Sequence, residues 1–332
     1  MGLQIGNIVP RKAIDFTELK NKKIAVDAFN TIFQFLSTIR QPDGTPLMDK
    51  QKNVTSHLSG LFYRNINLMK QGLKLIYVFD GQTPRLKGKT HEKRQQVKDE
   101  AFEKYEKAKD EEDVEEMGKY ARQLSTLTPE MLEESKQLLE AMGITVIQAP
   151  GEGEAQASHL AKRKEIYAVG SQDYDSLIFG APILIQNLTL ARKRKTPTGY
   201  VSIGPELISL EKVLNSLQID LDQLICLGIL SGTDYNPGGV KGIGPKKALD
   251  LVKKKKAPAL IFKDLEMDFD WQEVFELFKK PNIRDTEIKF PKLDKSKVKQ
   301  ILLDHDFSED RIDSALEKLQ KAKEEATQQT LF

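Results

Sequence analysis

Acidic side chains in this sequence recur at the ends of short apolar runs, or just after them. Acids that gather in one place repel one another and raise one another's pKa values, unless a cation lies between them. Carboxylate oxygens, without cysteine or paired histidine, suit a hard divalent ion such as Mg²⁺ or Mn²⁺. The acids that follow this pattern are Asp27, Asp80, Glu152, Glu154, Asp173 and Asp175.

The apolar runs before these acids read as strands of a parallel α/β sheet, because they alternate with stretches of helical spacing. The carboxyl ends of parallel strands meet at one edge, where ligands bind. One acid after a strand usually only caps the next helix, whereas acids after four successive strands indicate a shared metal site. The predicted strands are residues 23–27, 74–80, 144–148, 166–171 and 183–186.

Composition limits the class of protein. The chain has 332 residues, and its hydrophobic content of 39% permits a sizeable core. Lys and Arg (51) almost balance Asp and Glu (49), so charge segregation matters more than the sum of +2. The single cysteine, Cys226, lies in an apolar run and suits a core position in a reducing compartment. With no signal-peptide pattern and no apolar run of membrane-spanning length, we expect a cytoplasmic protein and no membrane partner.

A charged interruption, residues 81–127, separates the second predicted strand from the third. Its first half is basic and includes Lys87 and Arg94, whereas acids cluster in residues 110–116. A solvated helical insertion held by i,i+4 ion pairs explains the second half. Because the basic half follows Asp80 directly, we expect it to overhang the acidic edge, where it could bind a polyanion.

A glycine-rich turn opens a later helix. Gly242 and Gly244 precede Pro245, and proline favours the first position of a helix. Free backbone N–H groups at such a helix start can bind phosphate, and Lys246 and Lys247 follow at once. Gly-x-Gly alone is weak evidence, but the glycines and lysines together predict a sequence-independent contact with a nucleic-acid backbone. The basic run 192–195 could be another phosphate contact or an exposed polar hairpin.

In their order along the chain, these motifs closely resemble the flap endonucleases of the structure-specific 5′ nuclease superfamily, of XPG/RAD2 type. The resemblance extends from Gly2 to about Lys256, and the ending resembles the archaeal branch. The matching segments are Val26–Ala28, Tyr77–Gly81, Ala149–Ala155, Asp173–Asp175, Gly232–Tyr235 and Gly242–Pro245.

The resemblance implies an α/β fold: a PIN-like parallel sheet flanked by helices, with a helical arch insertion and a helix-hairpin-helix (H3TH, SAM-like) element. It also implies a division of the chain. The expected parts are residues 1–98 and 116–258 (one nuclease core), 82–128 (arch or clamp), 220–256 (helix-hairpin-helix), 257–325 (C-terminal helical region) and 326–332 (clamp-binding tail).

Residue roles follow from the resemblance position by position. Lys87 and Arg94 match arch-base cations that act on the scissile phosphate, and Gly2 matches a processed N-terminus near the site. Phe33 departs from the family, because many relatives have a base-stacking tyrosine at this position; we expect stacking to be kept and any hydroxyl contact to be lost. The expected metal-binding carboxylates are Asp27, Asp80, Glu152, Glu154, Asp173, Asp175 and Asp234. The expected DNA-binding residues are Arg40, Arg64, Gly232, Asp234, Gly242, Gly244, Lys246 and Lys247.

The implied activity is Mg²⁺-dependent 5′-flap endonuclease and 5′-3′ exonuclease cleavage of DNA, which leaves 5′-phosphomonoesters, in Okazaki fragment maturation and repair. Two Mg²⁺ ions per active site, for which Mn²⁺ can substitute, and K⁺ at the hairpin are the implied cofactors. The implied partner is branched DNA with a 5′ flap, bound by a monomer near the nucleoid, or in the nucleus if the source is eukaryotic. Gln328, Leu331 and Phe332 resemble the start of a motif that binds the sliding clamp PCNA, although the aromatic pair that closes this motif is missing here. The alternative interpretation of these residues is a frayed polar tail.

Two other classes remain open from the residues alone. A non-catalytic DNA-binding or scaffolding protein would share the basic turn, but its acids would only repel DNA. A metal-dependent phosphatase would share the acids, but it would leave the lysine-rich hairpin unexplained.

Overall fold

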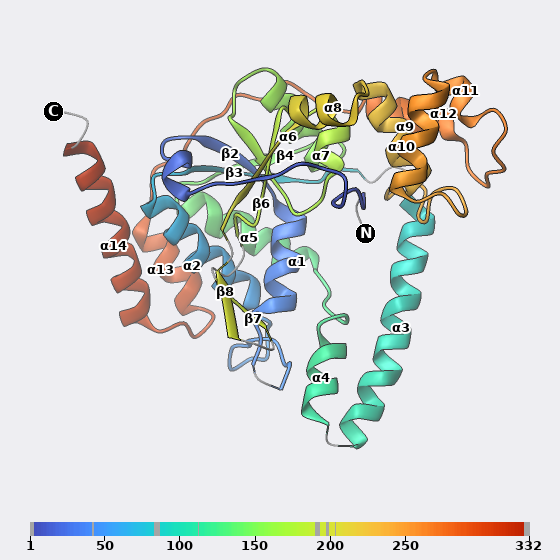
Figure 1. Cartoon of the computed structure of the whole chain (residues 1–332). Helices are drawn as coiled ribbons and strands as arrows, with labels where there is room; N and C mark the ends of the chain where they lie inside the picture. Colours follow the sequence, from blue (N-terminus) through green and yellow to red (C-terminus); the bar gives the residue numbers. More distant parts are fainter. Residues whose placement is uncertain are drawn as a thin grey trace.

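A seven-stranded sheet in the order β1-β9-β6-β5-β2-β3-β4 lies at the centre of the molecule (Figure 1). The computed structural model describes residues 3–41, 43–82, 87–111, 113–189, 193–196, 199–202 and 204–328. The strands of this sheet are β1 (Lys12–Ala13), β2 (Lys23–Asp27), β3 (Lys74–Phe79), β4 (Thr145–Gln148), β5 (Ala168–Gly170), β6 (Ile183–Gln186) and β9 (Glu206–Ser209).

The five predicted strands form the parallel part of the sheet, from β6 through β5, β2 and β3 to β4, so the fold-class prediction is confirmed. The prediction missed the antiparallel edge, where β9 pairs with both β6 and β1. Strand β1 has only two residues and β9 has four, which is too short for hydrophobic alternation to reveal them. The parallel strands are buried on both faces, as βαβ crossovers require.

Helices cover both faces of the sheet. On one face α1, α2, α5, α13 and α14 enclose a core that includes Phe35, Phe62 and Tyr77; on the other, α6 packs Leu160 and Ala161 against the strands. The bounds are α1 (Ala28–Thr38), α2 (Ser56–Lys70), α5 (Pro129–Ala141), α6 (Gly153–Lys162), α7 (Asp175–Ile178), α13 (Lys295–Leu303) and α14 (Glu309–Gln328), with a 3-10 turn at Phe16–Leu19.

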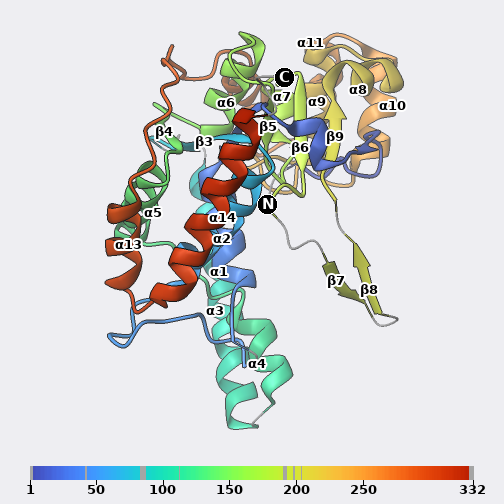
Figure 2. The same cartoon turned by 90° about the vertical axis from the view of Figure 1, so that its left-hand side faces the viewer.

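Two structures project from this body. The antiparallel pair α3 (Gly88–Asp110) and α4 (Val114–Ala121) extends away from the sheet and falls within the charged interruption (Figure 1). A two-stranded antiparallel ribbon, β7 (Lys193–Thr196) with β8 (Gly199–Ser202), stands apart from the sheet (Figure 2). The basic run thus contributes to a hairpin.

A second apolar core organises a helical lobe beside α7. It contains Cys226, which is fully buried as predicted, and a stacked pair formed by Phe262 and Trp271. The helices of this lobe are α8 (Leu210–Leu217), α9 (Leu221–Ser231), α10 (Pro245–Lys255), α11 (Pro258–Phe262) and α12 (Trp271–Lys279).

Among the described residues, no single helix has the length and apolar character to cross a membrane. The pair α8 and α9, which bends by 81°, meets the length and composition criteria only when its two helices are joined. The apolar residues of α9 are packed in the second core, as in an ordinary buried helix.

Candidate metal and nucleic-acid site

The predicted acids lie at the carboxyl edge of the parallel strands. Asp27 ends β2 and Asp80 follows β3, so both stand on neighbouring strands of the sheet. Glu152 is the N-cap residue of α6. Asp175 opens α7 after β5. A register of parallel strands therefore brings together acids that are far apart in the sequence, as the pattern predicted.

Electrostatic coupling shows that these acids are neighbours. Burial, followed by the charge of Asp80, raises the pKa of Asp27 well above its usual range. Burial and Asp175 do the same to the pKa of Glu154, and burial and Asp173 raise the pKa of Asp175 to about 7. In each case burial is the larger cause and a neighbouring carboxylate adds to it, so full ionisation of the cluster is disfavoured unless a further cation is bound.

Lys87 lies within this cluster. Its Nζ atom is 2.7 Å from Glu152 Oε2 and 4.0 Å from Asp234 Oδ2. The Lys87 and Glu152 side chains are only 13% and 17% exposed, so the ion pair is largely shielded from water. Burial alone would lower the pKa of Lys87, but Glu152 and then Asp80 raise it. The ammonium also lies 5.7 Å from the centre of the Tyr235 ring. The base of the charged interruption therefore meets the acidic edge.

The cluster is suited to a metal ion. The Oε1 atom of Glu154 is buried and has no hydrogen-bond partner, although a buried polar atom without one is costly. The donors are carboxylates, which suit Mg²⁺ or Mn²⁺. Among the residues the structure describes, no three or more His, Cys, Asp or Glu side chains are placed so that they could hold a metal ion without moving. A loose set of carboxylates nevertheless suits Mg²⁺, which keeps several waters.

Backbone and amide donors fix the acids in place, and sequence reasoning missed them. The Leu3 backbone N–H donates to Asp175 Oδ1 at 3.0 Å, and the Asn30 side-chain amide donates to Asp173 Oδ2 at 2.8 Å. The Gly153 N–H donates to Asp80 Oδ1 at 2.7 Å. A Cβ at Gly153 would lie 2.7 Å from that same oxygen, so the contact requires glycine. The sequence feature that could have revealed the role of Gly153 is its position between Glu152 and Glu154.

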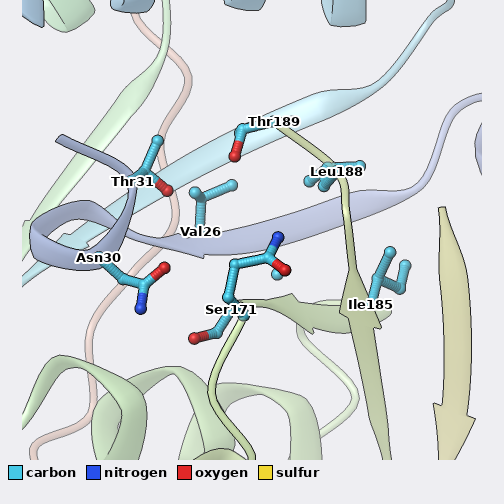
Figure 3. Close-up of a pocket in the computed structure, with 9 residues that line it drawn as sticks. Val26, Asn30, Thr31, Ser171, Ile185, Leu188 and Thr189 are labelled. Atoms are coloured by element: carbon cyan, nitrogen blue, oxygen red, sulfur yellow. The ribbon is translucent and has the colours of Figure 1, made fainter. Parts of the chain in front are cut away.

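A small cavity of about 10 Å³ lies beside the site, where α1 faces the loops after β5 and β6 (Figure 3). It could hold roughly one water and no nucleotide. The cavity is lined by Val26, Asn30, Thr31, Gly170, Ser171, Gln172, Ile185, Leu188 and Thr189.

The predicted phosphate-binding turn is exposed. Gly242 has φ +79°, which favours glycine, and Gly244 is the N-cap residue of α10, with Pro245 at the first helical position. Lys246 and Lys247 are both exposed, and Lys247 Nζ donates to the Gly242 carbonyl at 3.2 Å. Gly232, with φ +101°, ends α9 and is crowded by Gly239, so it has a structural reason to be glycine.

The predicted DNA-binding arginines Arg40 and Arg64 are at least partly packed within the protein. All three directed contacts of Arg40 are internal, to the carbonyls of Leu36 and Gly44 and to the Ser125 hydroxyl. Arg64 is half-buried on α2. The side chains of Arg94 and Gln328 lie outside the described part of the chain, as do Gly2, Leu331 and Phe332.

This arrangement, with acids along the carboxyl edge of an α/β sheet and the Lys87 ammonium among them, is typical of metal-dependent nucleases. Known proteins bear this out. The family model described as the XPG N-terminal domain matches residues 4–101, and the XPG I-region matches residues 143–234. Flap endonuclease 1 of Thermococcus onnurineus is 51% identical over 335 residues, covering 100% of this chain and 98% of that protein.

Solved structures agree. Flap endonuclease-1 from Methanococcus jannaschii superposes with a TM-score of 0.77 at 42% identity, covering 97% of this chain and 98% of the other. The catalytic core of Rad2 in complex with DNA substrate shares the fold, with a TM-score of 0.72 at 22% identity, covering 96% of this chain and 100% of the other. The chain belongs to the flap endonuclease 1 family.

Proposed function

We propose that this protein is a structure-specific 5′-flap endonuclease with 5′-3′ exonuclease activity, a hydrolase that acts on DNA in replication and repair. Its relatives from Thermococcus onnurineus and Pyrococcus furiosus, each matched over 98% of its own length, are named flap endonuclease 1. The residue roles below extend this proposal to individual side chains.

The observation that carries the proposal is the mutual repulsion of the buried acids. Asp27, Glu154 and Asp175 all have raised pKa values because each is buried next to another carboxylate. A protein that only bound DNA would gain nothing from this charge, since it repels phosphate. Divalent cations would relieve the repulsion and make the same edge attractive to a DNA backbone.

The predicted metal-binding residues are Asp27, Asp80, Glu152, Glu154, Asp173, Asp175 and Asp234. When bound there, two Mg²⁺ ions would supply an activated water and charge stabilisation for phosphodiester hydrolysis, and Mn²⁺ could replace them. Leu3, Asn30 and Gly153 orient three of these carboxylates through the hydrogen bonds described above.

Lys87 has two partners available during turnover. In the free protein its ammonium neutralises Glu152. With DNA and metal bound, the same ammonium would be free to face the scissile phosphate, where it would stabilise the charge that develops as the bond breaks. Arg94, which lies in helix α3 after its N-cap residue Lys87, is proposed to assist.

The hairpin before α10 is proposed to hold duplex DNA. Gly242 and Gly244 leave the backbone open to a phosphate. Lys246 and Lys247 add positive charge, which attracts the DNA backbone independently of its base sequence. Four further points remain predictions. The turn would bind K⁺, and PCNA would bind through Gln328, Leu331 and Phe332. The protein would be a monomer located near the nucleoid.

Cleavage of a duplex that carries a labelled 5′ flap, compared with a blunt duplex and with p-nitrophenyl phosphate, tests the proposal. We expect cleavage near the flap base in Mg²⁺, none in excess EDTA, and little release of p-nitrophenol. Hydrolysis of p-nitrophenyl phosphate without flap cleavage would favour a phosphatase. If the protein binds the flap duplex but does not cleave it in either Mg²⁺ or Mn²⁺, a DNA-binding scaffold would be favoured.

A further inference from the structure

A segment without helix or strand, residues 281–294, runs from α12 to α13 and crosses the body of the molecule (Figure 1). We call it the strap. It lies along β4, one of the two edge strands of the seven-stranded sheet. The Thr145 hydroxyl donates to the Lys289 carbonyl at 2.8 Å, and Arg284 Nη2 donates to the Gln148 carbonyl at 2.8 Å. The strap thus covers an edge that would otherwise offer unpaired backbone groups.

The strap also binds one side of helix α6. Gln156 Nε2 donates to the Arg284 carbonyl at 2.7 Å, and the Arg284 backbone N–H donates to Gln156 Oε1 at 3.0 Å. One residue further on, Asp285 pairs with His159 at 2.9 Å and with Arg163. Positions 156, 159 and 163 share one face of a helix, since they are three and seven residues apart. The strap therefore follows a single stripe of α6.

The contact of Gln156 with the strap differs from the two contacts of Asp285, with His159 and with Arg163. The Gln156 side chain is fully buried, whereas the Asp285 side chain is 71% exposed, and exposed ion pairs stabilise little. A neutral amide provides one donor and one acceptor, which match the free N–H and C=O of one backbone residue. If Gln156 were apolar, both groups of Arg284 would be left without these partners.

Gln156 is coupled to the acidic cluster through the first turn of α6. Its backbone N–H donates to the Glu152 carbonyl at 3.1 Å. Glu154, two residues before it, projects from nearly the opposite face of the helix. At Gly151 the strap lies so close that an added Cβ would be 3.1 Å from the Asn282 carbonyl. The strap therefore supports the same turn that presents Glu152 and Glu154 to the site.

We propose that Gln156 is a positioning residue for the metal site: by fixing α6 to the strap, it holds Glu152 and Glu154 at the separation that a divalent ion requires. This inference rests on the metal assignment made under the proposed function. Groups behind a metal's direct ligands commonly affect affinity about 10–100-fold. Gln156 acts one step further away, so we expect an effect of about three- to tenfold.

The test is metal binding without DNA or turnover. Free Mn²⁺ is measured by electron paramagnetic resonance while it is titrated into the full-length protein, well below the unfolding temperature. Gln156→Met keeps the volume and removes both hydrogen bonds, and should raise the Mn²⁺ dissociation constant about three- to tenfold. Gln156→Asn introduces a polar side chain that is too short to reach Arg284, so it should also raise the Mn²⁺ dissociation constant. This variant provides the test if the methionine variant does not fold.

Thr145→Val is the matched control, because it removes a partly buried hydrogen bond to the same strap at β4 rather than at α6. It should lower thermal stability and leave Mn²⁺ affinity unchanged. Wild-type affinity in both Gln156 variants would overturn the inference, as would an equal loss in Thr145→Val, which would indicate general loosening. Absence of Mn²⁺ binding by the wild-type protein would instead refute the metal assignment itself.

Discussion

Replacing Lys87 by methionine tests how charge is balanced at the acidic edge. The change keeps the aliphatic side chain and removes the ammonium that lies 2.7 Å from Glu152 Oε2 and 4.0 Å from Asp234 Oδ2. At an effective dielectric constant of about 20, these separations correspond to roughly 6 and roughly 4 kcal/mol of attraction. Burial of the charges offsets much of this, so the metal-free variant should lose about 3–5 kcal/mol of unfolding free energy, as when one partner of a buried ion pair is removed.

Metal affinity and turnover should change in opposite directions. Without the ammonium, Glu152 and Asp234 lose a competing cation, so Mg²⁺ should bind roughly three- to tenfold more tightly. Turnover should nevertheless fall about 10²–10³-fold, because Lys87 no longer stabilises charge on the phosphate. A simple loss of folding would lower both quantities together.

Urea unfolding in EDTA, Mg²⁺ titration calorimetry and single-turnover flap cleavage measure the three effects. Lys98→Met provides the control, since it removes the same charge from α3 at a position whose ammonium lies 3.3 Å from the Thr126 hydroxyl. If Lys87→Met unfolds like the wild-type protein in EDTA and cleaves at the wild-type rate, the reasoning about Lys87 is wrong.

Three further predictions concern other parts of the molecule. Burial and Asp173 raise the pKa of Asp175 to about 7 from an ordinary value of 3.8, so the folded metal-free protein holds a proton that the unfolded chain releases. Its stability in EDTA should therefore fall, by on the order of 2–4 kcal/mol, as the pH rises from about 4 to about 7, and urea unfolding of Asp175→Asn should show a flatter profile. Methionine at both Lys246 and Lys247 should weaken duplex binding at all sequences and reduce the slope of log affinity against log salt by about 2, as measured by fluorescence anisotropy. Arg40→Met should cost about 1–3 kcal/mol in unfolding free energy, because three internal hydrogen bonds are lost; weaker DNA binding at unchanged stability would show instead that Arg40 contacts DNA.

Much of the architecture was predictable because it depends on local pattern. The runs before Asp27 and Asp80 are short, apolar and rich in β-branched residues, and they are strands in the structure. Parallel pairing then requires their carboxyl ends to share an edge. The turn at Gly242 was also predictable, because glycine and proline restrict the backbone in known ways.

The antiparallel edge formed by β1 and β9 was not predictable, since such short strands gain their order from pairing rather than from their own sequence. The inward position of Arg40 was hidden for a similar reason. Its partner Ser125 is 85 residues away, and no local pattern reports a contact at that separation.

The sequence by itself determined which chemistry was available: carboxylates after successive strands, lysines beside a glycine turn, and no thiol or paired-histidine chemistry to compete with them. Only the tertiary structure decided how these groups are held. Asp175 depends on the Leu3 backbone N–H, and Gln156 on the strap at Arg284, across 172 and 128 residues of chain. Local preference follows from each residue and its neighbours, whereas such hydrogen bonds form only after packing has brought distant segments together.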